Sequence, residues 1–232
     1  MSADARHTES GSTPAGAEFR YGFVLLILLA LVVFEIVAPS SNWERAITVG
    51  LAGAALIVAV ATSRMASKRR RNLELVVSGF VAVMIVGIAA GALSAAFAHA
   101  AVAVIVVAIP VTIVRGLLRL VGERGATPQA IAGALSIYIL LGVLFASVIG
   151  FIAEVQSQPY FAQGPNVSNG DRFYFSFTVL TTTGFGDYTA ATPGGHALAV
   201  LEMLIGQLYL VTVIGVLIGH YISRRTEAER SS

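Results

Sequence analysis

The chain has 232 residues and a formal net charge of +2 at pH 7; 56% of the residues are apolar and only 12% are charged. A soluble domain of this length carries about twice that share of charged residues, so the composition points to lipid as the main solvent. The net charge is too small to argue for nucleic acid as a partner, and no basic aromatic patch suggests one, so we expect none. The absence of cysteine excludes disulfides, thiolate metal sites and cysteine nucleophiles.

The first twenty residues are polar and of mixed charge, and they predict a disordered tail at residues 1–20. An apolar segment follows directly. A cleaved signal peptide has a short basic leader, whereas this leader is long and carries Asp4, Glu9 and Glu18. We therefore expect the apolar segment to be an uncleaved first membrane span.

Six apolar segments reach or approach the roughly 20 residues that a helix needs to cross a bilayer. They run over residues 21–38, 46–62, 74–93, 98–115, 129–153 and 196–222. The third and fourth predict a tight helical hairpin that turns near residues 91–99, because residues 75–114 contain no acid, Lys or Arg. The pattern predicts an all-α membrane protein with six transmembrane helices.

The basic residues predict how these spans are oriented. If the N-terminus is cytoplasmic, only Arg45 and Arg172 lie outside and every other Lys and Arg lies inside. Both termini are then cytoplasmic, and the loop between the fifth and sixth spans is external. This layout divides the chain into a peripheral four-helix bundle (residues 21–121), a unit made of the last two spans and the loop between them (residues 129–222), and a short cytoplasmic tail (residues 223–232).

The external loop holds the segment that points to function. Residues 171–180 are too short and too aromatic to span, and they predict a half-length helix with Asp171 as its N-cap and Gly184 as the residue that breaks it. Irregular backbone at membrane depth is tolerated where it lines a watery path. The predicted architecture is thus six spans with one re-entrant pore helix and a selectivity-filter loop.

Gly184 and Gly186 flank Phe185, so two alternate positions can adopt positive φ without a side-chain penalty. Alternating backbone handedness lets successive carbonyl oxygens point the same way and replace the hydration shell of a monovalent cation. The half-length helix aims its negative C-terminal dipole at the same place. No nucleophile, general base or cofactor is needed, so the loop predicts passive ion permeation and not an enzyme.

The segment Thr182-Thr183-Gly184-Phe185-Gly186-Asp187, preceded by Thr181, resembles the Thr-Val-Gly-Tyr-Gly-Asp filter of the potassium-channel pore family. The resemblance covers about a hundred residues, and the segment 202–210 is similar to bacterial six-span, single-pore-loop members. It implies a potassium-selective subunit whose ions are held by the carbonyls of Thr182, Thr183, Gly184 and Phe185 and by the Thr182 hydroxyl. It further implies filter support from Thr181, Asp187, Tyr174, Phe175, Thr178 and Glu202, and a gating hinge at Gly206, for which helix packing is the alternative role.

Two positions depart from the family pattern. Phe185 replaces the usual Tyr and loses a hydroxyl, whereas Thr183 replaces Val and gains one. Because both side chains should point away from the ions, we expect a change in filter stability more than a loss of selectivity.

The family filter needs four loops around an axis and this chain has one, which predicts a homotetramer in a lipid bilayer. The similarity to bacterial members implies a bacterial plasma membrane, and we expect no small-molecule substrate. The alternatives are a poorly selective monovalent cation channel and a non-conducting regulatory membrane subunit. A secondary transporter would show paired broken helices in internal repeats, whereas the interrupted segment occurs once.

Several polar residues near the predicted span ends have a second interpretation. We expect Glu35 to reach the lipid headgroups, although an acid inside a span also raises a functional hypothesis. Arg115 and Arg119 resemble the stub of a voltage sensor. The fourth span itself carries no Lys or Arg and contains Pro110, which we expect to interrupt it, so a basic linker is the favoured interpretation.

Overall fold

The computed structural model describes residues 20–39, 41–62 and 67–230. Within these residues the chain is helical and contains no strand; one isolated antiparallel bridge joins Phe161 and Ala190. The predicted all-α fold is therefore confirmed. The helices are α1 (Arg20–Val37), α2 (Asn42–Thr62), α3 (Ser67–Ala89), α4 (Ala95–Arg124), α5 (Pro128–Val155), α6 (Asn169–Leu180), α7 (Pro193–Tyr209) and α8 (Gly215–Arg230), with a π-helical turn, Leu210–Ile214, between the last two.

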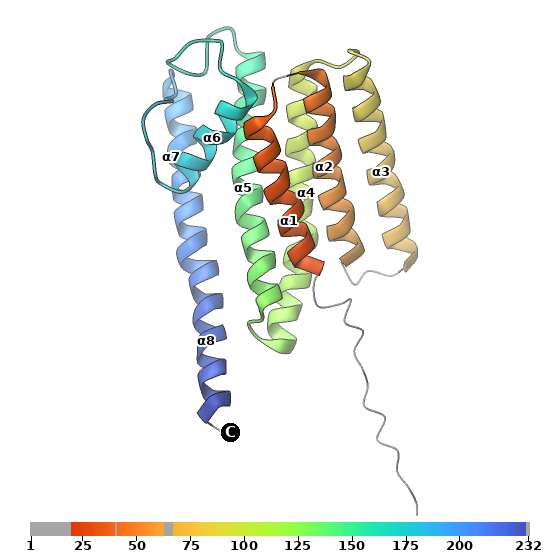
Figure 1. The fold of residues 1–232 in the computed structure, drawn as a ribbon, viewed down its shortest axis with the longest axis vertical. Helices are drawn as coiled ribbons and strands as arrows, with labels where there is room; N and C mark the ends of the chain where they lie inside the picture. The colour runs from red at the N-terminus through yellow and green to blue at the C-terminus, as the bar shows by residue number, and fades with distance from the viewer. Residues whose placement is uncertain (1–19, 40, 63–66, 231–232) are drawn as a thin grey trace, which may run out of the picture.

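Helices α1 to α5 form a bundle, and α7 with α8 form one long helical column at its side (Figure 1). Helix α1 packs against α2 and α5, while α4 packs against α2 and α5. Helix α6 lies obliquely between α5 and α7, and the chain that follows it returns to the end of the molecule where α5 ends (Figure 1). The short helix is thus framed by the two long helices that precede and follow it.

Local sequence explains where the long helices begin and end. The predicted turn is present: α3 ends at Ala89, and Gly91 adopts a φ of 69° before α4 begins at Ala95. The two helices do not pair as a tight hairpin, because α3 packs on α2 and has little contact with α4. Gly125 adopts a φ of 70° after α4, and the Thr127 hydroxyl then accepts a hydrogen bond from the Ala130 amide at the start of α5. Left-handed backbone at these two positions favours glycine, and a Thr cap followed by Pro favours a new helix.

Among the described residues, four helical segments are long and apolar enough to cross a membrane: Asn42–Val60, Arg70–Ala89, Pro128–Val155 and Pro193–Ser223. The first and fourth predicted spans correspond to the shorter apolar helices Tyr21–Val37 and Ala95–Pro110. Large apolar side chains are exposed along the spans, among them Leu26, Val83 and Leu204. This composition and exposure identify a multi-pass membrane protein.

Two expectations about the bundle are wrong. Pro110 does not interrupt the fourth helix, because α4 continues through it to Arg124. Glu35 does not reach toward the headgroups; its side chain is fully buried among α1, α2 and the start of α6. The predicted tail at residues 1–19 lies outside the described residues, as do the side chains of Arg115 and Arg119.

Candidate functional site

Helix α6 begins with a reciprocal cap. The Ser168 hydroxyl accepts a hydrogen bond from the Asp171 amide at 3.1 Å, and the Asp171 carboxylate accepts one from the Ser168 amide at 3.0 Å. The prediction that Asp171 is the N-cap is therefore wrong. The N-cap is Ser168, and Asp171 is the third residue of the helix. The sequence carries Ser168 three residues before Asp171, which is the spacing of a capping box.

The same carboxylate has a perturbed acidity. Partial burial acts to raise the pKa of Asp171, but hydrogen bonds from Ser168 and from Tyr188 together lower that pKa below the ordinary value for aspartate. The hydrogen bond from Tyr188 to Asp171 is also the main cause that raises the pKa of the Tyr188 phenol, and burial contributes less to this shift. The first turn of α6 is thus hydrogen-bonded, through Asp171, to Tyr188, which follows the segment 181–187.

Helix α6 has twelve residues and ends at Leu180, four residues before the glycine that was expected to break it. Three hydrogen bonds from the next main-chain amides close the helix: the Thr182 amide donates to the Val179 carbonyl, and the Thr183 and Gly184 amides both donate to the Thr178 carbonyl. The turn therefore ends the helix through backbone geometry before Gly184 is reached.

The segment after the turn alternates in backbone handedness. The φ angles are 57° at Thr182, 50° at Gly184 and 81° at Gly186. Positive φ was expected at the two glycines, and the structure adds Thr182, a residue type that rarely adopts it. Residues 181–187 are all exposed in the single chain, so this irregular backbone faces open space on one side.

Hydroxyl groups connect the end of α6 to this segment. The Thr181 hydroxyl donates to the Phe177 carbonyl at 2.7 Å and lies 2.9 Å from the Thr183 hydroxyl. Since the single Thr181 proton is used on Phe177, the Thr183 hydroxyl is the donor to Thr181. Thr178 likewise donates to the Phe175 carbonyl at 2.8 Å. Thr183, which stands where the family pattern has valine, thus stabilises the loop through a side-chain hydrogen bond to Thr181.

The aromatic residues that were expected to surround the filter lie on two sides of α6. The Tyr174 ring stacks on the Phe185 ring, with centroids 6.2 Å apart and an interplanar angle of 2°. The Phe175 ring instead contacts Phe161 edge to face at 5.2 Å, inside a small buried cluster. Of these two rings, the Tyr174 ring stacks on a residue of the filter-like segment, and the Phe175 ring packs on Phe161.

Gln163 is a residue of this site that sequence reasoning missed. Its amide nitrogen donates to the Asp187 carbonyl at 2.7 Å, and its amide oxygen accepts from the Thr189 amide at 3.2 Å. The Asp187 carboxylate accepts from the Tyr188 amide at 3.1 Å. Gln163 lies in a polar loop with no pattern that marks it, so only the folded structure could identify it.

Behind α6, Glu202 of α7 is fully buried and lies 2.5 Å from the Ser176 hydroxyl. The same hydroxyl lies 2.9 Å from the Gly142 carbonyl of α5. Ser176 has one proton to donate, and the carbonyl can only accept. These two contacts link α5, α6 and α7 at one point, and the support role of Glu202 for a filter stays a prediction.

Gly206 allows α7 to approach the end of α6. A Cβ atom at this position would clash with the Leu180 carbonyl oxygen and lie 2.8 Å from the Leu180 side chain. Gly206 is buried in a continuous helical segment, and the helix becomes irregular only at the π-helical turn four residues later. The structure thus gives Gly206 a packing role, and the hinge at this residue stays a prediction.

Part of the chain is similar in sequence to known ion channels. Residues 134–222 match the ion-channel family model, described as "Ion channel". The chain is 27% identical over 116 residues to the mouse and human proteins named "Potassium voltage-gated channel subfamily A member 10", which covers 48% of this chain and 22% of each relative. It is 25% identical over 118 residues to "Potassium voltage-gated channel subfamily A member 2" of Xenopus laevis, covering 50% of this chain and 23% of that protein.

The matched region is thus about half of this chain and less than a quarter of the relatives' length. The family-model match contains most of α5, all of α6, the alternating segment, all of α7, the π-helical turn and the first half of α8. The resemblance of this part of the chain to the potassium-channel pore family, predicted from the segment Thr182–Asp187, is confirmed.

Proposed function

We propose that the protein is a subunit of a potassium-selective channel in which α5, α6, the segment after it and the α7–α8 column form one quarter of the pore. The observation that carries this proposal is the positive φ at Thr182, Gly184 and Gly186 in an exposed segment directly after a half-length helix. Alternating handedness turns successive carbonyls to one side, where they can replace an ion's hydration shell.

The length of α6 supports the same function. Twelve residues of α-helix extend about 18 Å, too little to cross ~30 Å of hydrocarbon. A helix of this length that starts at the external face ends inside the membrane, where its C-terminal dipole favours a cation. Ions would be held by the carbonyls of Thr182, Thr183, Gly184 and Phe185 and by the Thr182 hydroxyl.

The single chain cannot enclose an ion path. The filter-like segment is exposed, and Phe185 has 69% of its surface accessible although it is a large aromatic residue. Four copies around an axis would cover this surface and complete the ring of carbonyls, so the proposed assembly is a closed homotetramer. In the proposed topology six helices cross the membrane and both termini are cytoplasmic.

The test is potassium flux through the purified full chain in liposomes. Gly186→Ala should abolish flux, because alanine is strained at a φ of 81°. Gly219→Ala is the matched control, since a Cβ at Gly219 meets no atom within 4 Å. Absence of flux from a tetrameric wild-type protein would refute the channel.

A poorly selective cation channel is the second candidate, because the Thr183 hydroxyl bonds to Thr181 where the family pattern has an apolar valine. Permeability under bi-ionic conditions separates the two candidates. Equal sodium and potassium permeability in the wild type, with potassium preference restored in Thr183→Val, would establish the second. Strong potassium preference in both proteins supports the first.

A further inference from the structure

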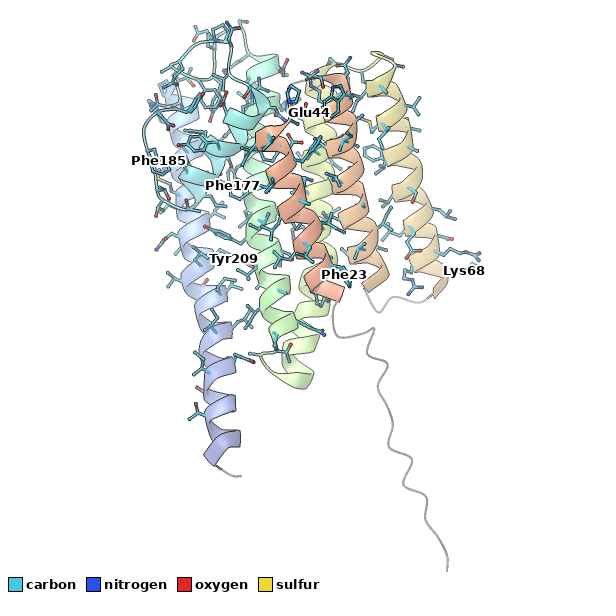
Figure 2. The ribbon with its side chains drawn as sticks, in the orientation of Figure 1. Phe23, Glu44, Lys68, Phe177, Phe185 and Tyr209 are labelled. Carbon is cyan, nitrogen blue, oxygen red and sulfur yellow. The ribbon has the colours of Figure 1, made fainter. Side chains whose placement is uncertain are left out.

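Two acidic side chains from the peripheral bundle meet the first residue of α6. Glu35 lies near the end of α1 and Glu44 in the first turn of α2, and both are fully buried. The side-chain amide of Asn169 donates to the Glu35 carboxylate and, at 2.8 Å, to the Glu44 carboxylate. Figure 2 shows Glu44 at the end of the bundle where α1, α2 and α6 come together.

The backbones approach closely at the same point. A Cβ on Gly170 would lie 2.8 Å from the Ile36 carbonyl oxygen and 3.0 Å from that of Glu35. The first turn of α6 is therefore packed on the last turn of α1 with no room for a side chain. Any change in how the two acids hold Asn169 acts directly on the start of α6.

The geometry assigns a proton to this pair. Two buried carboxylates that share one amide donor repel each other when both are ionised, because no water screens them. Glu44 is the better site for the negative charge, since it lies at the N-terminus of α2 and accepts a hydrogen bond from the Ser41 amide. The proton is then held by Glu35.

Thr48 supports the same assignment. Its hydroxyl contacts both the Glu35 carboxyl group and, at 3.1 Å, the Glu44 carbonyl. A carbonyl accepts and cannot donate, and Thr48 has a single proton. Both contacts are satisfied when Thr48 donates to the carbonyl and a protonated Glu35 donates to Thr48.

The other charged and titratable groups at this end come from every helix packed on the pair. Arg45 of α2 and His99 of α4 line a cavity of about 10 Å³ beside Glu44 and Asn169, close to the room that one water molecule needs. Arg172 of α6 donates to His99 Nε2 at 3.2 Å, which leaves that ring neutral, and forms an ion pair with Glu154 of α5 at 3.4 Å. Asp171 is turned toward Ser168.

We propose that Glu35 and Glu44 form a proton-operated latch that fixes the start of α6 to the peripheral bundle, so that channel opening responds to pH on the face where α6 begins. The latch rests on the proposed channel function. With one shared proton the two acids hold Asn169. When rising pH removes the proton, the two like charges separate and release the first turn of α6.

The experiment records single channels of the full-length protein in planar bilayers with symmetric potassium while pH is varied on one side at a time. Raising pH on the α6 side from about 5 to about 9, the range in which buried carboxyls titrate, should lower open probability about tenfold, as expected for the loss of a charged hydrogen-bonded contact. Glu35→Gln keeps a neutral group and should remove the response. Glu154→Gln, on the neighbouring partly exposed acid, should retain it.

A second measurement does not depend on conduction. The infrared difference spectrum at neutral pH, reconstituted wild type minus Glu35→Gln, should show the carbonyl band of a protonated carboxylic acid, and the subtraction removes any band of the buried Glu202, which both proteins share. An unchanged pH response in Glu35→Gln, or a difference spectrum without this band, would overturn the latch. A protein that shows the Glu35 band but passes no ions would support the shared proton and refute the channel function instead.

Discussion

Ser176 and Glu202 are 26 positions apart in the sequence, yet the serine hydroxyl lies 2.5 Å from the carboxyl group of the glutamate in the buried space behind α6. The contact lies between α6, which precedes the filter-like segment, and α7, which follows it. With the contact from Ser176 to the Gly142 carbonyl, it fixes three helices at one point. A contact of this kind restrains α6, and with it the start of the filter-like segment, against α5 and α7.

Replacing Glu202 with alanine should weaken the proposed tetramer. The change leaves a cavity and removes one of the two partners of the buried Ser176 hydroxyl, which together cost about 2–4 kcal/mol. Glu202→Gln has nearly the same shape and keeps a group that can hydrogen-bond Ser176, so it should cost less than half as much. Thermal dissociation of the tetramer, followed by native mass spectrometry, measures the difference; equal losses in the two variants would argue against the contact.

The predictable parts of this protein are those that local sequence determines. Apolar length predicted α5 and the turn between α3 and α4, and two glycines predicted two of the left-handed positions in the filter-like segment. Thr182 was not predicted to adopt positive φ, because its conformation is imposed by amides that bond back to the end of α6. Glu35 was misread because its partner Asn169 is 134 positions away, and no local pattern reports such a contact.

The close approach at Gly206 makes a second prediction. Gly206→Ala places a methyl group against the Leu180 carbonyl, and backbone oxygen cannot move aside as a flexible side chain can. We expect lower flux and a tetramer destabilised by about 1–3 kcal/mol. Gly215→Ala is the matched control in the same column, since its nearest contact, the Leu210 carbonyl, lies at an ordinary 3.7 Å.

A flexible hinge and tight packing make different predictions for this residue. If Gly206 acts only as a hinge, alanine should alter the open probability and leave tetramer stability unchanged. If it acts by packing, stability falls together with flux. Thermal dissociation and single-channel recording on the same preparation separate the two roles.

The cap of α6 predicts a dependence on acid. Hydrogen bonds from Ser168 and Tyr188 lower the pKa of Asp171, so this carboxylate stabilises the folded state above its unfolded pKa of about 3.9, and the stabilisation is lost as pH falls through the lower folded value. Asp171→Asn should lower the stability of the folded state by about 1 kcal/mol near neutral pH, and the loss of stability at acid pH should be smaller in this variant than in the wild type. Thermal melting of the tetramer from about pH 7 to about pH 3 tests this; parallel curves for the two proteins would contradict the assignment.

The last prediction is weak voltage dependence. Moving one elementary charge through 100 mV supplies about 2.3 kcal/mol, so steep gating requires several charges per subunit to cross the field. The apolar part of α4, Ala95–Pro110, contains no Lys, Arg, Asp or Glu, and Arg115 and Arg119 follow it toward the proposed cytoplasmic side. Glu35 and Glu202 are buried in packed contacts, which opposes their movement. Open probability measured against voltage in symmetric potassium should therefore change gradually. A sigmoidal curve with an effective valence of about four or more per tetramer, lost when Arg115 and Arg119 are replaced with glutamine, would instead establish α4 as a voltage sensor.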